Sequence, residues 1–121
     1  MPGRARLQEI GARRYEEHCA SCHGDQGQGV TGAYPPLAGN RAVTMGPIDN
    51  LLQTLLFGGF NAATPGHPRP FGMPPFLLTL SDTEVASVLT HVRTAWGNQA
   101  SAVTPLQVHR LRAATLRSGP D

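Results

Sequence analysis

The sequence predicts an all-α fold built from short helices and long loops. Apolar side chains recur at helical spacing in several separate segments, and no segment shows the alternation typical of a β-strand. The 14 glycines and 11 prolines make up about a fifth of the 121 residues, which indicates stiff loops rather than a disordered chain. Only 6% of the residues are aromatic, so a large bound group could supply the apolar bulk that the side chains lack.

The first expected helix runs from Arg4 to His18, where apolar residues share one face. Gly11 lies in that face, and because glycine weakens a helix we expect a packing reason, such as the close approach of another helix. Asp49–Phe57 is a second, apolar helix that two glycines terminate. Residues 24–47 and 60–76 are predicted loops.

Two more helices are expected in the C-terminal part. Ser81 and Glu84 fit an S-x-x-E capping box before a periodic apolar segment, which we expect to end at Gly97. Thr104 precedes a proline, the pattern of an N-cap followed by the first helical position. The last short helix is therefore expected to begin there and to run through Arg112.

Charge and hydropathy exclude several classes of function. The net charge is only +2 and the arginines are spread over both ends of the chain, so no concentrated basic face for nucleic acid is expected. No run of about 18 apolar residues predicts a membrane span. The N-terminus lacks the apolar segment of a signal peptide.

One motif carries chemistry, Cys19-Ala20-Ser21-Cys22-His23. The two intervening residues let one helical turn present both sulfurs to the same edge of a porphyrin, where thioether bonds form to its two vinyl groups. The histidine that follows can offer an imidazole nitrogen to the iron. The motif therefore predicts one covalently attached haem c, with His23 as an iron ligand.

Three other roles for the cysteine pair are a structural disulfide, a thioredoxin-like redox pair and half of a zinc site. A zinc site needs four ligands, and the sequence has no second cysteine pair. A thioredoxin-like pair is expected after a strand, whereas a helix leads into this motif. Haem attachment is the preferred interpretation.

The best candidate for the sixth iron ligand is Met73, in the segment FGMPPF. Prolines restrain the backbone of this loop, so a soft thioether can be held against the iron at low entropic cost. Methionine opposite histidine raises the reduction potential and leaves no open position on the iron. The alternative role of Met73 is a core methionine. The weaker ligand candidates are Met45, His18, His67, His91 and His109.

Further residues are candidates for the surroundings of the haem. The segment Pro35-Pro36-Leu37 follows His23 by about twelve residues, so a carbonyl there could accept the second ring N–H of the histidine. Several more residues could contact the haem, although an ordinary surface or core role is at least as good an interpretation for each of them. Candidates for the haem wall are Leu37, Phe57, Phe76, Val85 and Leu89, and candidates for propionate contacts are Tyr34, Asn40, Arg41 and Trp96.

With these motifs the sequence resembles the class I cytochrome c family over residues from about 5 to 98. Gly11 and Tyr15 are similar to the glycine and the aromatic residue of that family's N-terminal helix. Pro35 matches the proline whose carbonyl accepts the N–H of the proximal histidine, and Met73 matches the distal methionine. The resemblance gives Pro35 and Met73 those two roles.

The resemblance also implies the fold and the domain organisation. We expect the class I cytochrome c fold, wrapped around one haem c, as a single domain over residues 1–121. Its core covers about 5–98, and 99–121 form a C-terminal extension. Val88 and Val92 look like the apolar contacts of the family's C-terminal helix, whereas His91 stands where the family often has tyrosine.

Three stretches, YPPLAGNRAVTM, LLFGGFNAATPGHPRPFGMPPF and LSDTEVASVLTHVRTAWGN, are similar to a haem domain of the cytochrome c subunits of bacterial membrane-bound alcohol and gluconate dehydrogenases. The resemblance implies an electron carrier rather than an enzyme. The expected donor is a periplasmic dehydrogenase, and the expected acceptor is an oxidase or another cytochrome. A periplasmic location is expected because covalent haem attachment in bacteria occurs outside the cytoplasmic membrane.

Two alternatives stay open at this point. One is a haem subunit or domain within a dehydrogenase complex, in which the basic tail 99–121 is a docking arm instead of a helix packed on its own domain. The other is a haem sensor or peroxidase with a labile sixth ligand. Since haem attachment requires export, we interpret a sequence without a visible signal peptide as a mature or trimmed form.

Overall fold

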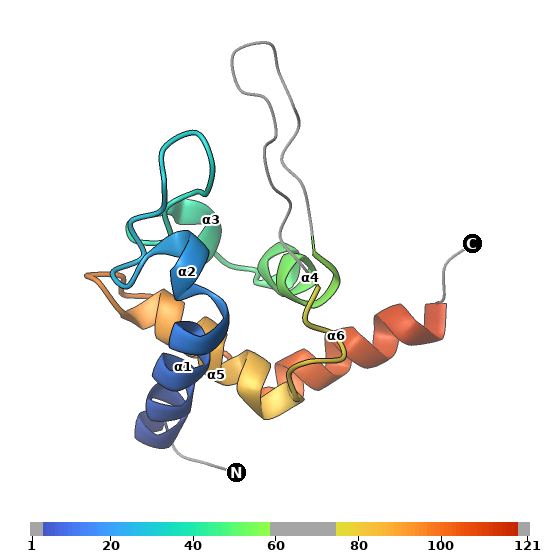
Figure 1. Cartoon of the computed structure of the whole chain (residues 1–121). Coiled ribbons are helices and arrows are strands. Elements are labelled where there is room, and N and C mark those ends of the chain that lie inside the picture. The colour runs from blue at the N-terminus through green and yellow to red at the C-terminus, as the bar shows by residue number, and fades with distance from the viewer. Residues whose placement is uncertain (1–3, 59–74, 119–121) are drawn as a thin grey trace.

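The computed structural model describes residues 4–58 and 75–118 of the chain, and within them it contains helices and no strand. The helices are α1 (Arg4–His18), α2 (Ala20–His23), α3 (Arg41–Thr44), α4 (Asp49–Phe57), α5 (Asp82–Thr94) and α6 (Pro105–Ser118) (Figure 1). The predicted all-α fold is confirmed. Among these residues, none of the helices combines the length and apolar character needed to span a bilayer.

Local sequence signals set the bounds of two helices and the start of a third. α1 and α4 have the predicted bounds. The predicted capping box opens α5: the Ser81 hydroxyl accepts from the Glu84 amide at 3.2 Å, and the Glu84 carboxylate accepts from the Ser81 amide at 3.0 Å. Both ends of the box satisfy backbone N–H groups that would otherwise lack a partner at the helix start.

The ends of the last two helices differ from the prediction. α5 ends at Thr94, before the predicted Gly97. Ala95 is already extended and Trp96 takes a left-handed φ of +55°, so neither residue continues the helix. α6 continues past the predicted Arg112 to Ser118. Two alanines follow Arg112, and alanine is the strongest helix former, so nothing local stops the helix there.

One predicted loop contains a helical turn. α3 lies inside residues 24–47, where the Asn40 side chain accepts from the backbone N–H of Ala42 at 2.9 Å and caps the turn. This helical turn was not predicted, because a turn of four residues is too short to show helical periodicity. Most of the other predicted loop, 60–76, lies outside the described residues.

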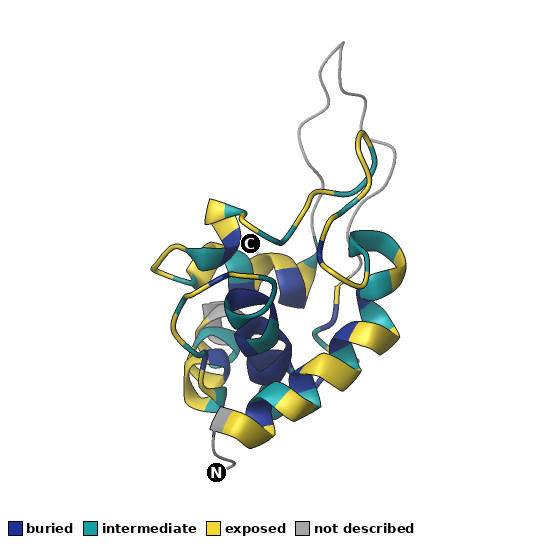
Figure 2. Cartoon of the chain, turned by 90° about the vertical axis from the view of Figure 1, so that its left-hand side faces the viewer, coloured by how far each residue is buried: buried dark blue, intermediate teal, exposed yellow. Residues whose placement is uncertain are grey.

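α1 and α5 make the most extensive helix contact in the described part of the chain, and Gly11 sits at their crossing. A Cβ atom at Gly11 would lie 2.0 Å from the carbonyl oxygen of Ser87 and 3.0 Å from the Cβ atom of His91. The predicted packing reason for this glycine is confirmed. α5 is the most enclosed helix, since every residue over 85–90 is buried (Figure 2).

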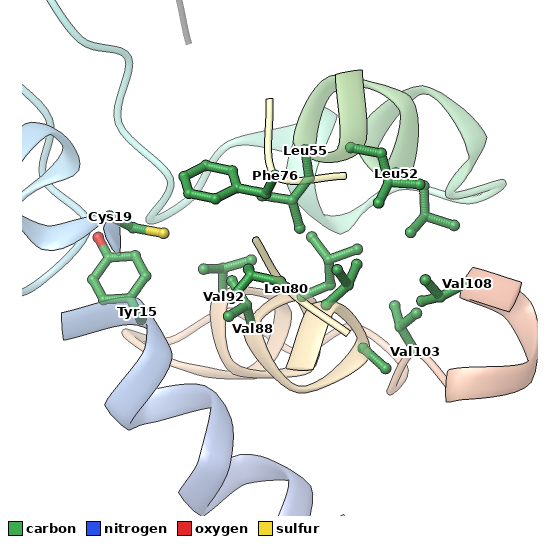
Figure 3. Packing of buried hydrophobic residues seen from close by; sticks show 14 of the residues in the cluster. Tyr15, Cys19, Leu52, Leu55, Phe76, Leu80, Val88, Val92, Val103 and Val108 are labelled. Atoms are coloured by element: carbon green, nitrogen blue, oxygen red, sulfur yellow. The ribbon is translucent and has the colours of Figure 1, made fainter. Parts of the chain in front are cut away.

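The hydrophobic core lies between α5 and its neighbours α1, α4 and α6 (Figure 3). Burial of each valine or leucine there contributes roughly 1.5–3 kcal/mol before the entropy of folding is subtracted. The core residues are Tyr15, Cys19, Val43, Leu52, Leu55, Leu56, Phe76, Leu80, Val85, Ala86, Val88, Leu89, Val92, Val103 and Val108.

A buried arginine ties α3 and the chain after α5 to this core. Arg93 is only 3% exposed, and its Nη1 donates to the carbonyls of Val43 at 2.8 Å and Met45 at 3.0 Å. Its Nε donates to the carbonyl of Ser101 at 2.9 Å. These bonds offset the cost of burying the guanidinium, and the remaining burial lowers the pKa of Arg93.

Candidate haem-binding site

The C-x-x-C-H motif lies at the junction of α1 and α2. The amide of Cys19 donates to the carbonyl of Tyr15 at 2.8 Å, so the last turn of α1 leads directly into the motif. The carbonyl of Cys19 accepts from the amides of Cys22 and His23 at 3.1 and 2.9 Å. One turn of backbone therefore holds both sulfurs and the imidazole, which is the spacing needed for two bonds to one porphyrin edge.

The two cysteines are free thiols in different surroundings. Cys19 is 7% exposed and belongs to the core cluster, where Figure 3 shows it next to Tyr15. Cys22 is half-buried. Burial, and to a lesser degree the neighbouring Cys22, raises the pKa of Cys19 to about 11. The disulfide alternative is not formed, and both sulfurs are available for thioether bonds.

The imidazole of His23 is oriented by a backbone carbonyl. Its Nδ1 lies 2.9 Å from the carbonyl oxygen of Pro35. Since a carbonyl only accepts, Nδ1 must carry the hydrogen and donate, which leaves Nε2 with a free lone pair. A metal-ligating histidine needs this tautomer and this kind of partner. The residues present therefore fit a haem iron bound at Nε2.

A tight turn brings Pro35 back to His23. The amide of Gly29 donates to the carbonyl of His23 at 2.7 Å, and Gly29 has a φ of +71°. A Cβ atom on Gly29 would lie 2.6 Å from the carbonyl oxygen of Tyr34 and 2.7 Å from the carbonyl carbon of Pro35. Only glycine meets both the conformation and the space at this position.

Asn98 fixes the chain that follows Pro35, and sequence reasoning missed it. The side chain is 7% exposed; its Oδ1 accepts from the amide of Gly39 at 2.9 Å. Its Nδ2 donates to the carbonyls of Leu37 at 3.1 Å and Val92 at 2.7 Å. Gly39 and Leu37 lie about 60 positions away in the chain, and Val92 belongs to no recognisable motif. The only signal in the sequence was therefore an asparagine in a turn after a helix.

Three rings back the motif where α1 meets α5. The ring centroids of Tyr15, His91 and Trp96 lie 5.1–5.3 Å apart. The Tyr15 hydroxyl donates to the carbonyl of Gly24 at 2.6 Å, directly after the motif. Burial lowers the pKa of His91, so this ring is neutral near pH 7. Trp96, a candidate for a propionate contact, lies in this ring cluster and packs on Gly27.

Only some of the candidates for the sixth iron ligand lie among the described residues. Met73 and His67 lie outside the described residues, so the Met73 assignment stays a prediction. Met45 is 54% exposed, and the His109 side chain is 64% exposed. His18 packs edge-on against the ring of Phe76, with centroids 5.6 Å apart.

The other predicted contact residues also differ in burial. Phe76, Val85 and Leu89 are buried in the core, Leu37 is half-buried against it, and Phe57 is 36% exposed. Tyr34 lies with its ring centroid 6.4 Å from that of His23. Arg41 is exposed at the first residue of α3, and Asn40 is the cap of that helix.

Among the described residues, no further side chains stand beside the cysteine pair to complete a zinc site. Across residues 4–58 and 75–118, no group of three or more His, Cys, Asp or Glu side chains is placed to hold a metal ion. A thioredoxin-like setting also needs a strand before the pair, and α1 occupies that place. Fold and motif together define a small all-α protein of the kind that binds haem covalently.

Comparison with known proteins gives the family. The family model described as cytochrome c matches residues 8–96, which is most of the chain. The chain belongs to the cytochrome c family, and its helices form the class I fold. It carries one covalently attached haem c and transfers electrons.

Individual relatives are of two kinds. The chain is 39% identical over 103 residues to the cytochrome c subunit of the quinone alcohol dehydrogenase of Gluconobacter oxydans, covering 84% of this chain and 22% of that protein. It is 34% identical over 106 residues to the gluconate 2-dehydrogenase cytochrome c subunit of Pantoea cypripedii, covering 86% and 24%. It is 36% identical over 124 residues to cytochrome c-552 of Thermus thermophilus, covering 96% and 83%. The chain thus spans about a quarter or less of the dehydrogenase subunits and most of the Thermus protein.

Proposed function

We propose that Cys19 and Cys22 hold the haem through thioether bonds and that His23 and Met73 ligate its iron. The observation that carries this proposal is the 2.9 Å contact between His23 Nδ1 and the Pro35 carbonyl, one helical turn from two free thiols. Pro35 orients the imidazole and increases the basicity of Nε2. When bound, the haem supplies a one-electron couple at its iron.

We further propose one cytochrome c domain over residues 1–121, with a core at about 5–98 and an extension at 99–121. Histidine and methionine together fill both axial positions, so no position is left for a substrate, which favours a carrier over a peroxidase or gas sensor. The protein is then an electron carrier and not itself an enzyme. Arg41, exposed at the start of α3, is assigned to a haem propionate.

The proposed donor is a periplasmic dehydrogenase, and the proposed acceptor is an oxidase or another cytochrome. The names of several relatives, which are cytochrome subunits of alcohol, gluconate and fructose dehydrogenases, support such a donor. The match along most of cytochrome c-552 supports a separate carrier instead of a fixed subunit. A periplasmic location is proposed because covalent haem attachment in bacteria takes place there.

Haem attachment is tested by expressing the chain together with a bacterial haem-ligation system. We expect purified protein with the added mass of one haem and a strong Soret band. Cys19→Ser and Cys22→Ser should each lose one thioether bond, while Ser21→Ala, in the same turn, should keep both. Wild-type protein without covalent haem would contradict the proposal.

The axial ligands are tested by spectroscopy of the ferric protein. A methionine–iron bond gives a weak long-wavelength absorption band, which we expect in the wild type and in Met45→Ala but not in Met73→Ala. The Met73→Ala protein should also bind carbon monoxide rapidly when reduced and have a lower reduction potential. Rapid carbon monoxide binding by the wild type would instead favour the sensor or peroxidase alternative.

The partner is tested separately, by size-exclusion chromatography of the native preparation and by rapid-mixing reduction with a quinoprotein alcohol dehydrogenase. A free carrier should elute as a small protein and become reduced by the dehydrogenase. Elution only in a stable complex would favour the subunit alternative.

A further inference from the structure

The hydrogen bond that orients His23 lies at the surface of the protein. Pro35, which supplies the accepting carbonyl, is exposed, and His23 is half-buried. Because Nε2 is the nitrogen assigned to the iron, Nδ1 on the other side of the imidazole points away from the haem. The haem therefore does not cover this hydrogen bond. Water competes for an uncovered N–H and an uncovered carbonyl, so protection of the bond has to come from the protein's own side chains.

Tyr34 lies beside this hydrogen bond. Its ring centroid is 6.4 Å from that of His23, and the two ring planes meet at 63°, so the edge of one ring faces the other. Tyr34 is half-buried, and it directly precedes Pro35 in the chain. The Tyr34 ring is therefore next to both the residue that donates and the residue that accepts.

Backbone hydrogen bonds fix where Tyr34 lies. The chain between α2 and α3 folds back on itself (Figure 1), and Val30 and Tyr34 pair there as an isolated antiparallel bridge. Each amide of the pair donates to the carbonyl of the other at 2.8 Å. One residue before the bridge, the amide of Gly29 donates to the carbonyl of His23 at 2.7 Å. The backbone of Tyr34 is thus tied through this turn to the residue whose ring it faces.

The phenol end of Tyr34 is held as well. Burial, and then a hydrogen bond with the Cys22 side chain, raises the pKa of Tyr34. The hydroxyl therefore keeps its proton and donates to the sulfur. A thioether sulfur is also a weak acceptor, so this contact is compatible with haem attachment at Cys22. Tyr34 accordingly contacts the second cysteine and the histidine of the motif with one side chain.

We propose that Tyr34 is a positioning residue for the proximal histidine, because its ring excludes water from the His23–Pro35 hydrogen bond. The inference rests on the proposed role of His23 as an iron ligand. With water excluded, the imidazole keeps the orientation and the Nδ1–H tautomer that leave Nε2 for the iron. Tyr34 acts through His23 and not on the haem itself, which differs from the propionate contact considered for it from the sequence.

The test measures how fast the Nδ1 proton of His23 exchanges with solvent. The ferrous, haem-loaded protein with two axial ligands is diamagnetic, so NMR spectroscopy can follow this proton after transfer to heavy water, and exchange requires the hydrogen bond to open. We expect slow exchange in the wild type and roughly tenfold faster exchange in Tyr34→Ala, because a hydrogen bond in contact with water has little net stability. Tyr34→Phe keeps the ring and loses only the hydroxyl, so its rate should stay within about twofold of the wild type, since an apolar ring excludes water equally well.

Two control variants separate cover of the hydrogen bond from general effects. Thr31→Ala changes an exposed side chain of the same loop and should exchange like the wild type. Leu7→Ala removes a buried side chain from α1 and should lower the melting temperature without changing the exchange rate well below that temperature. The inference is overturned if Tyr34→Ala exchanges like Thr31→Ala, or if Leu7→Ala shows the same acceleration.

A second variant covers the case in which Tyr34→Ala does not fold. Valine suits the extended backbone of the pair with Val30 but is too short to cover the imidazole. Tyr34→Val should therefore also exchange roughly tenfold faster than the wild type. Exchange at the wild-type rate in this variant would overturn the inference, and so would a Tyr34→Phe protein that exchanges as fast as Tyr34→Val.

The same spectra separate the role of Tyr34 from the ligand assignment. The ring current of a porphyrin shifts the carbon-bound ring protons of an axial histidine far upfield in a ferrous protein. A wild type without such shifted His23 protons would contradict the proposed ligand itself. Shifted protons together with exchange rates that do not respond to Tyr34 would contradict only the role of Tyr34.

Discussion

Replacing Gly11 by alanine sets two effects of known size against each other. Alanine is favoured over glycine inside a helix by about 1 kcal/mol, so the helix alone would gain stability. The new Cβ atom, however, would lie 2.0 Å from the carbonyl oxygen of Ser87 and 2.6 Å from its carbonyl carbon. These are backbone atoms of a buried helix and cannot rotate away, so α1 and α5 must move apart.

The cost of this separation outweighs the gain in helix propensity. Overpacking a close-packed interface costs typically 1–3 kcal/mol, and a rigid contact this short belongs at the upper end of that range. The net loss is then about 2 kcal/mol. For a domain of this size that corresponds to a melting temperature lower by roughly 8 °C.

The assay is thermal unfolding of the haem-loaded protein, followed by far-UV circular dichroism and by the Soret band. Ala12→Gly, at the exposed neighbouring position of α1, calibrates the propensity term and should cost about 1 kcal/mol. A Gly11→Ala protein that melts at or above the wild-type temperature would refute the reasoning, because the gain in helix propensity would then exceed the cost of overpacking.

Three further predictions concern the surroundings of the site. Asn98→Ala should lower stability by about 2–3 kcal/mol in denaturant unfolding, because Leu37 and its neighbours lose buried partners; a loss under 0.5 kcal/mol would contradict this. His91→Phe should make the stability of the protein less sensitive to acid. Burial lowers the pKa of His91, so the stability contributed by its neutral ring is present above the ordinary value of 6.5 and is lost as the pH falls through the folded pKa. An unchanged stability profile below pH 6.5 would count against this. Glu84→Gln should keep the capping box with Ser81 but flatten the profile below about pH 4.5, because the backbone hydrogen bond from Ser81 lowers the Glu84 pKa and its contribution is lost as the pH falls through the folded value; melting curves at pH 3 and pH 6 compare the two proteins.

The elements that could be predicted are those with local causes. α1 and α4 carry their periodicity within a few residues, the glycines that end α4 follow it directly, and the capping box of α5 is a four-residue pattern. The predicted end of α5 was wrong because it depends on Trp96 packing against Tyr15 of α1 and His91 of α5. Such a tertiary contact leaves no pattern in the neighbouring sequence.

The same division applies to the site. The cysteines and the histidine could be named because haem attachment fixes their spacing, whereas Pro35 was named through the family resemblance. The His23–Pro35 contact has the geometry that the role of Pro35 requires. Asn98 could not be named, because its bonds to Leu37 and Gly39 cross 61 and 59 positions of the chain. An asparagine that stabilises a distant loop looks, in sequence, like any other asparagine in a turn.

The enclosure of α5 has a consequence for how the protein opens in solution. Its residues 85–90 have no solvent-facing side, and α1, α3 and α6 all pack against it. No local fluctuation can therefore expose its amides without detaching a neighbour, so their hydrogen exchange should proceed only through global unfolding. Exchange measured in this helix would then report the stability of the whole molecule, while the ends of α1 and α6 would exchange by fraying.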